Sequence, residues 1–374
     1  MMTRTAAAAA TALLATTSLA AAGGIERSAF TTGILFEEGT FAELSFGYAD
    51  PSVSGTAPAA LGGASSGDVT SGFLNYGVSY RTDLSEALSL AFVIDRPVGA
   101  NVDYPAGTGY PFAGSSAEIT SNQLTAMLRY ELSNGFSAYG GVRAVMVSGS
   151  AYVSAGPAFA YQLDSESDIG FGYMGGVAYE LPQFAARVAL TYFSEVSLDF
   201  TGTENPAPAG TPEGGFPLAA TSFNVTLPQS VLLEAQTGVA PGTLVFGSVR
   251  WTDWGSFDIT PARYPAGSLV DYPEDVWTYT LGVGRQLTDS LAVSATVDYE
   301  TEQDGTQGNL GPTDGRISLG LGAEYTINNI SIGIGGQYIL IGDAATILNR
   351  TPRITSTFAD NTAWGVGVRI GIQF

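Results

Sequence analysis

The sequence has no cysteine and no histidine. Without cysteine there is no disulfide or thiol chemistry, and the redox compartment cannot be read from the chain. Without histidine the commonest metal ligand and general base is missing. The acidic stretch EQDGTQGNLGPTDG (302–315) lacks the ligand spacing of a calcium loop. We therefore expect no cofactor, no metal site and no enzymatic activity.

Charge is also scarce, and long apolar runs are absent. Charged residues make up 13% of the chain, about half the usual quarter. The net charge of −21 argues against a nucleic-acid partner, whose phosphates need a basic surface. Beyond the N-terminal segment no stretch of about 18 apolar residues occurs, which excludes spanning helices. No linker or charge block divides the chain, so we expect a single large domain.

The N-terminal residues have the features of an export signal. Arg4 supplies a positive start, an Ala/Thr/Leu-rich stretch supplies the apolar centre, and Ala20–Ala22 supplies small residues for a signal peptidase. We expect residues 1–22 to be a cleaved signal peptide.

Strict alternation of apolar and small or polar residues is the main signal in the rest of the chain. In the last segment Trp364, Val366, Val368 and Ile370 fall on one face, and Arg369 falls on the other. A period of two with one wholly apolar face predicts a strand between lipid and lumen.

The same pattern predicts fourteen strands, at 41–48, 72–82, 88–96, 119–132, 136–148, 168–180, 184–201, 222–238, 243–260, 276–286, 291–301, 316–327, 330–341 and 362–374. Short turns and long Gly/Pro-rich loops alternate between them. The fold class is therefore all-β, a transmembrane antiparallel β-barrel over 41–374 in the outer membrane of a Gram-negative bacterium. A soluble β-sandwich would explain some alternation, but not the export signal, the terminal Phe374 and the loop asymmetry together.

Charged residues on the strands fall on the phase that faces the lumen, because a charge near the middle of the lipid face costs about 2–4 kcal/mol. The expected inward arginines are Arg81, Arg129, Arg143, Arg187, Arg250, Arg316 and Arg369. The expected inward acids include Glu131, Glu180, Glu195, Asp199, Glu234, Asp298, Glu300 and Glu324. These pairs either brace the lumen or, in a minority of cases, contribute a ligand site.

The third strand ends in Asp95-Arg96-Pro97-Val98-Gly99. Proline removes a ladder donor and glycine permits a bend, so this is a place for a kink or a side opening in the wall. The alternative is that the strand simply stops there. Pro228 similarly predicts a bulge or an unpaired position.

The outer loops carry many apolar side chains. They include Tyr104, Tyr110, Phe112, Tyr152, Phe159, Phe216, Leu218, Tyr264, Leu269 and Tyr272. An exposed aromatic rim would form a landing surface that captures hydrophobic molecules. The alternatives are contact with lipopolysaccharide and packing between loops.

Three segments resemble the FadL/TodX family of outer-membrane transporters of hydrophobic compounds: YFSEVSLDFTG (192–202), VTLPQSVLLEAQTG (225–238) and RWTDWGSF (250–257). ADPSVSGTAP (49–58) resembles the first loop of that family. The resemblance implies a monomeric barrel, plugged by an N-terminal hatch, that moves long-chain fatty acids or aromatic hydrocarbons. It also implies capture between outer loops, an inner apolar site, and release through a kink in strand three, whose position Gly99 and Pro97 match.

The chain departs from the family in two respects. The hatch must be short, confined to residues 23–40, and the Asn-Pro-Ala hatch motif is absent. The basic residues that contact a fatty-acid carboxylate in the family fall at Val153 and near Glu274, which favours a neutral ligand unless an inward arginine substitutes.

The expected partners are hydrophobic small molecules, outer-membrane lipid and lipopolysaccharide, and the barrel-assembly machinery through Phe374. A passive porin for small polar solutes is the main alternative function, and the charged lumen is its best support. A role of the loops as an adhesin or phage receptor also stays open.

Overall fold

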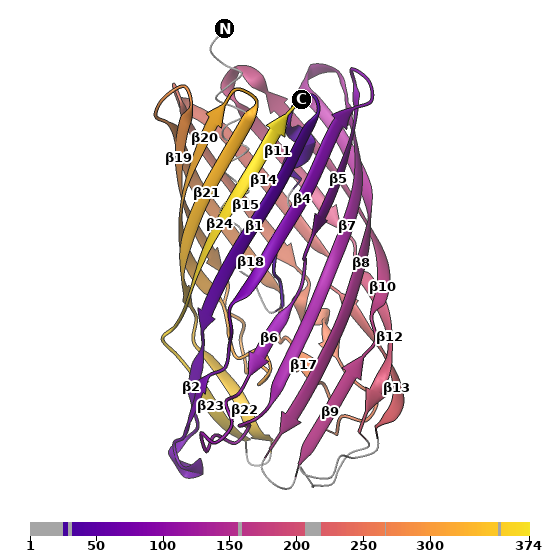
Figure 1. Cartoon of the computed structure of the whole chain (residues 1–374), viewed down its shortest axis with the longest axis vertical. Helices are drawn as coiled ribbons and strands as arrows, with labels where there is room; N and C mark the ends of the chain where they lie inside the picture. The colour runs from indigo at the N-terminus through magenta and orange to yellow at the C-terminus, as the bar shows by residue number, and fades with distance from the viewer. Residues whose placement is uncertain (1–24, 29–31, 156–158, 206–217, 266, 351–352) are drawn as a thin grey trace.

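The computed structural model describes residues 25–28, 32–155, 159–205, 218–265, 267–350 and 353–374. The expected signal segment lies outside this part of the chain. The described residues form a tall barrel of tilted strands, shown in Figure 1 with the C-terminus at the upper end. Within them, no helix is both long and apolar enough to span a membrane.

Fourteen antiparallel strands make the wall: β1 (Phe41–Ser52), β4 (Phe73–Asp83), β5 (Leu88–Asp95), β7 (Ser116–Glu131), β8 (Phe136–Ser154), β10 (Asp168–Leu181), β11 (Ala186–Phe193), β14 (Ser230–Ala240), β15 (Thr243–Thr252), β18 (Val276–Gln286), β19 (Leu291–Glu300), β20 (Arg316–Ile327), β21 (Ile330–Ile341) and β24 (Asn361–Gln373). Each pairs with the next, and β24 pairs with β1 to close the ring. The predicted fold and strand number are confirmed.

Shorter strands extend the wall or join the loops: β2 (Ser54–Thr56), β3 (Ser65–Asp68), β6 (Ala100–Asp103), β9 (Ala160–Ser165), β12 (Val196–Glu204), β13 (Ala219–Leu227), β16 (Asp258–Ile259), β17 (Val270–Asp271), β22 (Ala344–Arg350) and β23 (Arg353–Phe358). Short 3₁₀ turns are η1 (Gly33–Phe36), η2 (Ala59–Leu61), η3 (Ser133–Gly135), η4 (Pro182–Phe184) and η5 (Trp254–Ser256).

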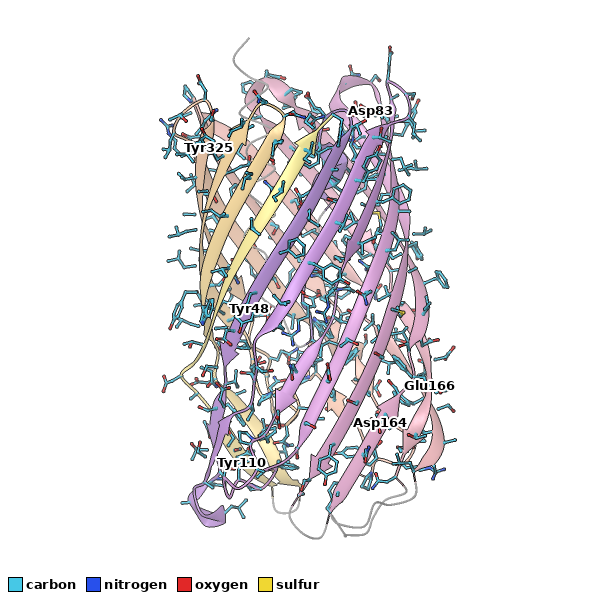
Figure 2. All side chains as sticks on the ribbon, in the orientation of Figure 1. Tyr48, Asp83, Tyr110, Asp164, Glu166 and Tyr325 are labelled. Atoms are coloured by element: carbon cyan, nitrogen blue, oxygen red, sulfur yellow. The ribbon has the colours of Figure 1, made fainter. Side chains whose placement is uncertain are left out.

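Alternate residues of each wall strand point outward and are apolar. Leu281 and Leu321, for example, are more than 60% exposed, as expected for side chains that face lipid. Figure 2 shows such side chains around the whole barrel, with Tyr325 near one end and Tyr48 near mid-height. Tyr48 packs against Trp364 with ring centroids 5.6 Å apart, as in the aromatic girdles of membrane barrels.

The two ends of the barrel differ. One end has short connections, such as the turn between β20 and β21, where Asn328 has a positive φ of 54°. The other end carries the long loops, including a small four-stranded sheet of β22, β23, β2 and β3. This alternation agrees with the predicted turns and loops, and it places the long loops on the outer side of the membrane.

One strand changes phase along its length. In β11 the buried side chains are Arg187, Ala189, Thr191 and Phe193, whereas in β12, its continuation, they are Val196, Leu198 and Phe200. The break at Ser194 and Glu195 inserts the extra residue, as in a β-bulge. A one-residue slip sends every later side chain to the opposite face.

A second break lies between β13 and β14. It consists of Pro228 and Gln229, which belong to neither strand. Because proline has no N–H to donate, the ladder cannot continue through it. The predicted irregularity at Pro228 is confirmed.

Candidate transport site

The wall is interrupted between β4 and the strand that follows it. β4 pairs with β5 only from Val78–Ile94 to Asp83–Ser89, so residues 73–77 of β4 pair with β1 alone. β5 ends at Asp95, and β6 resumes at Ala100 as a partner of β7. We call the space between residues 73–77 and residues 95–99 the wall gap.

The sequence explains why the ladder stops there. Between the pairs Asp95–Gln123 and Ala100–Ile119 the β5–β6 strand has one residue more than β7, which makes a bulge. Pro97 within this bulge has no N–H. All four residues predicted for the opening, Asp95, Arg96, Pro97 and Gly99, lie at the wall gap.

The N-terminal segment lies against the wall gap. The Arg27 N–H donates to the Pro97 carbonyl at 2.9 Å, and the Gly99 N–H donates to the Ile25 carbonyl at 2.7 Å. On the other side of the gap, Asn75 Nδ2 donates to the Arg27 carbonyl. The segment therefore joins the two edges that do not pair with each other.

This close approach leaves little room for a side chain at Gly99. A Cβ at this position would lie 3.0 Å from Arg27 Cγ and 3.2 Å from the Ile119 carbonyl oxygen. The Arg27 guanidinium then stands over the Phe73 ring, 3.6 Å from its centroid, a favourable cation–π geometry.

Two further polar side chains border the wall gap. Arg96 Nη1 donates to the Leu74 carbonyl at 2.8 Å, a group that the missing ladder leaves unpaired. The Asp95 carboxylate accepts hydrogen bonds from Ser28 Oγ at 2.8 Å and from Gln123 Nε2 at 3.1 Å. The gap is thus edged by polar groups within a mostly apolar wall.

Two of the cavities lined by the described residues lie inside the barrel. The first, which we call the apolar cavity, has about 60 Å³ and a lining that includes Leu198, Phe200, Val225 and Phe257. The second, which we call the gap cavity, has about 150 Å³ and a mixed lining that includes Arg27, Phe73, Gly99, Glu300 and Arg316. Ile25 and Leu310 line both cavities, so these two side chains stand between them.

The inward arginines form ion pairs with acids of the N-terminal segment and of the wall strands. Arg250 pairs with Glu26 at 2.6 Å, and Arg316 pairs with Glu300 at 3.3 Å. Further ion pairs join Arg81 to Asp83, Arg129 to Glu131 and Glu180, and Arg369 to Glu43 and Glu324.

The η1 turn is held in the same way. Arg129 Nη1 donates to the Leu35 carbonyl at 3.1 Å, and the Arg129 and Arg187 guanidiniums stack on Phe36. Thr32 Oγ1 donates to Glu234 at 2.8 Å. These charges brace the lumen, and Arg143 joins them by donating to the Ser194 carbonyl at 2.8 Å.

Glu195 and Asp199 do not face the lumen, and that expectation is wrong. Both are exposed, while Val196 and Leu198 between and beside them are buried. Asp199 accepts a hydrogen bond from the outward Asn224 at 2.9 Å. The phase change at the β11–β12 break, which simple alternation does not reveal, puts these acids on the outer surface.

The aromatic residues predicted to capture ligand lie mainly in packed loops. Tyr104 is fully buried, stacks on Tyr110 with centroids 5.5 Å apart, and donates to the Asn309 carbonyl at 2.6 Å. Tyr110, labelled in Figure 2, hydrogen-bonds Ser356 at 2.6 Å. Phe112 packs against the same cluster. A capture role for these three side chains would require the loops to part.

The other predicted capture residues are spread around the rim. Phe159 is partly buried against the cluster that lines the apolar cavity, Tyr152 is half-buried, and Leu218 is exposed. Phe216 lies outside the described residues.

Sequence reasoning missed the most connected residues of the N-terminal segment. Ile25, Glu26, Arg27 and Phe36 have no periodic pattern around them, so nothing marked their partners. Val153 is buried in the cluster that lines the apolar cavity.

A closed antiparallel barrel with an apolar outer wall and long loops at one end defines an outer-membrane barrel protein. The model of the family "Outer membrane protein transport protein (OMPP1/FadL/TodX)" matches residues 49–374. The chain belongs to this family, and its place is the outer membrane.

Solved structures and a curated sequence are similar to this chain. A FadL homologue from Pseudomonas aeruginosa superposes with a TM-score of 0.77 at 14% identity, covering 91% of this chain and 92% of the other. The toluene transporter TodX from Pseudomonas putida gives 0.66 at 13% identity, covering 96% of each chain. The long-chain fatty acid transport protein of Salmonella typhi is 24% identical over an alignment 206 residues long, which covers 46% of this chain. The chain thus spans about 42% of the length of that relative.

Proposed function

We propose that this protein mediates passive uptake of hydrophobic compounds, either long-chain fatty acids or neutral hydrocarbons, across the outer membrane. A ligand enters between the outer loops, rests in the apolar cavity, passes to the gap cavity, and leaves sideways through the wall gap into outer-membrane lipid. The family to which the chain belongs supports transport, and the relatives named above include fatty-acid and toluene transporters.

The observation that carries this proposal is the position of Ile25. Its side chain is one of the two that stand between the cavities, and its carbonyl accepts a hydrogen bond from Gly99 at the wall gap. Moving the N-terminal segment would therefore leave only Leu310 between the cavities and would free the gap in the same event. A lateral path also has a thermodynamic reason, because an apolar ligand that enters lipid directly never has to dissolve in water.

The same contacts support a hatch role for residues 23–40, which is part of this proposal. The segment is tied to β15 through Glu26, to β14 through Thr32 and to β7 through Leu35. These contacts, together with paired charges, occupy the lumen. A porin-like channel needs an open water-filled pore, so this arrangement favours a transporter of hydrophobic compounds.

Closing the wall gap tests the lateral path. Replacing Pro97 with Val and Gly99 with Thr restores a ladder donor and places a β-branched side chain against Arg27. Uptake of radiolabelled toluene and oleate by cells should fall, while glucose uptake and heat-modifiable migration on gels stay normal. The control is Gly308→Thr, a position with open space around it. Unchanged toluene and oleate uptake in the folded double variant would exclude the lateral path.

A further inference from the structure

Two arginines face the wall gap from opposite sides. Arg27 reaches it from the N-terminal segment, where its side chain lies between Gly99 and the Phe73 ring. Arg96 reaches it from the end of β5 and touches the far edge at the Leu74 carbonyl. Burial, together with the charge of Arg96, lowers the pKa of Arg27 to about 10. Arg27 is therefore positively charged at neutral pH.

Neither arginine forms an ion pair in the described part of the chain, whereas Arg250, Arg316 and Arg369 each pair with at least one carboxylate. Among the described residues, the partner of the Arg27 guanidinium is an aromatic face and that of the Arg96 guanidinium is a carbonyl oxygen.

The acids around the gap have other hydrogen-bond or ion-pair partners among the described residues. Asp95 accepts from Ser28 and Gln123. In the gap cavity, Glu300 pairs with Arg316, and Asp314 accepts from the Gln303 N–H at 2.8 Å. Two like charges at one opening repel each other, and an anion placed between them would relieve that repulsion.

The gap cavity fits the rest of such an anion. Besides its polar groups, its lining includes the apolar side chains of Val53, Val276 and Ile339. Guanidinium groups bind carboxylates through paired N–H donors in a planar fork. We propose that Arg27 and Arg96 form a carboxylate-binding subsite at the wall gap, which takes the head group of a hydrophobic carboxylate while its apolar tail lies in the gap cavity.

This subsite selects among the ligands of the proposed function, on which it rests. A neutral hydrocarbon gains nothing from the two charges, whereas a fatty-acid carboxylate would otherwise cross the apolar wall with its charge unpaired, at high cost. Arg27 and Arg96 thus act on the head group of the ligand, and the apolar lining acts on its tail.

The test compares one ligand with and without its charge. Cells that express the protein are given radiolabelled oleate, methyl oleate or toluene. In the double variant Arg27→Met/Arg96→Met, oleate uptake should fall on the order of tenfold, as expected for the loss of charge-assisted hydrogen bonds. Uptake of methyl oleate and toluene should not change. The conservative variant Arg27→Lys/Arg96→Lys should recover most of the oleate uptake.

The control is Arg285→Met. It removes an exposed arginine near the end of β18, a strand that does not border the wall gap. Equal loss of all three ligands in the double variant would mean that the arginines only support the wall, and unchanged oleate uptake would mean that no carboxylate binds there. Either result overturns the subsite. If the wild-type protein transports none of the three, the proposed function itself fails. Heat-modifiable migration verifies folding, and if the double variant does not fold, each single Arg→Met variant must show the same selective loss of oleate uptake.

Discussion

The Glu26 carboxylate lies 2.6 Å from the Arg250 guanidinium, and both side chains are buried in the lumen. One residue belongs to the N-terminal segment and the other to β15, 224 positions further along the chain. Arg250 also donates to Ser230 on β14. This ion pair ties the segment to the wall.

Removing Glu26 should loosen the N-terminal segment. Glu26→Ala leaves Arg250 buried without its carboxylate, and breaking a buried pair in this way costs about 3–5 kcal/mol. Release of the segment would let water reach Arg250 and recover part of this cost. Because the chain has no cysteine, a cysteine at Ser28 is a clean reporter, and its maleimide labelling should be faster by at least about tenfold. Glu38→Ala, at an exposed position of the same segment, should leave the labelling rate unchanged.

Labelling of the last strand should distinguish its two faces. Val368 is exposed on the outer wall, whereas Arg369 is buried and bonded to Glu43 and Glu324. In membranes, a cysteine at position 369 should react with a small aqueous thiol reagent, and a cysteine at 368 should react only with a reagent that partitions into lipid. Preferential aqueous labelling at 368 would contradict the register of β24.

Gly282 should not tolerate a larger residue. A Cβ there would lie 2.3 Å from the ring of Phe246, which covers this position from β15 and is itself buried. Gly282→Val forces the ring to move and should destabilise the barrel by about 1–3 kcal/mol in urea titrations. Gly175→Val is the matched control, because its nearest contact is 3.9 Å away. A midpoint equal to that of the wild type would show that the ring moves at little cost.

The loop between β19 and β20 should become more stable in mild acid. Burial raises the pKa of Asp314 from 3.8 to about 6. Between these values the folded loop binds a proton that the unfolded loop does not, so its stability rises as the pH falls from above 6 towards 4. Hydrogen exchange of residues 302–315, corrected for intrinsic rates, should be slower at pH 5 than at pH 7.5. Asp314→Asn should abolish the difference, and faster corrected exchange at pH 5 would refute the assignment.

The barrel wall could be predicted because lipid imposes one rule on every strand. Trp364 and Val366 point outward on β24 as the period of two requires, and turns such as 328–329 follow from strand ends. The same rule failed at Asp199. The extra residue at Ser194–Glu195 changes the phase of the strand, and no proline, glycine or other residue type marks it in the sequence. Pro228 was found because proline itself breaks a ladder.

The candidate site could be predicted only in part. Pro97 and Gly99 mark the wall gap by their own backbone chemistry, but the residues that reach it from elsewhere do not. Arg27 contacts Pro97, which is 70 positions away in the sequence, and a local sequence pattern does not predict a contact between distant segments. Loop composition also left Tyr104 ambiguous, because aromatic residues that pack together have the same sequence signature as aromatic residues that face solvent.

The pairing of β1 with β24 determines when the barrel can close during folding. Phe41 lies opposite Gln373, and Ser52 lies opposite Thr362. The first wall strand to be synthesised must wait for the last one before both of its edges are bonded. Until then the unfinished sheet has two open edges, each able to pair with another chain. Safe passage through the periplasm therefore depends on keeping those edges occupied until the final strand arrives.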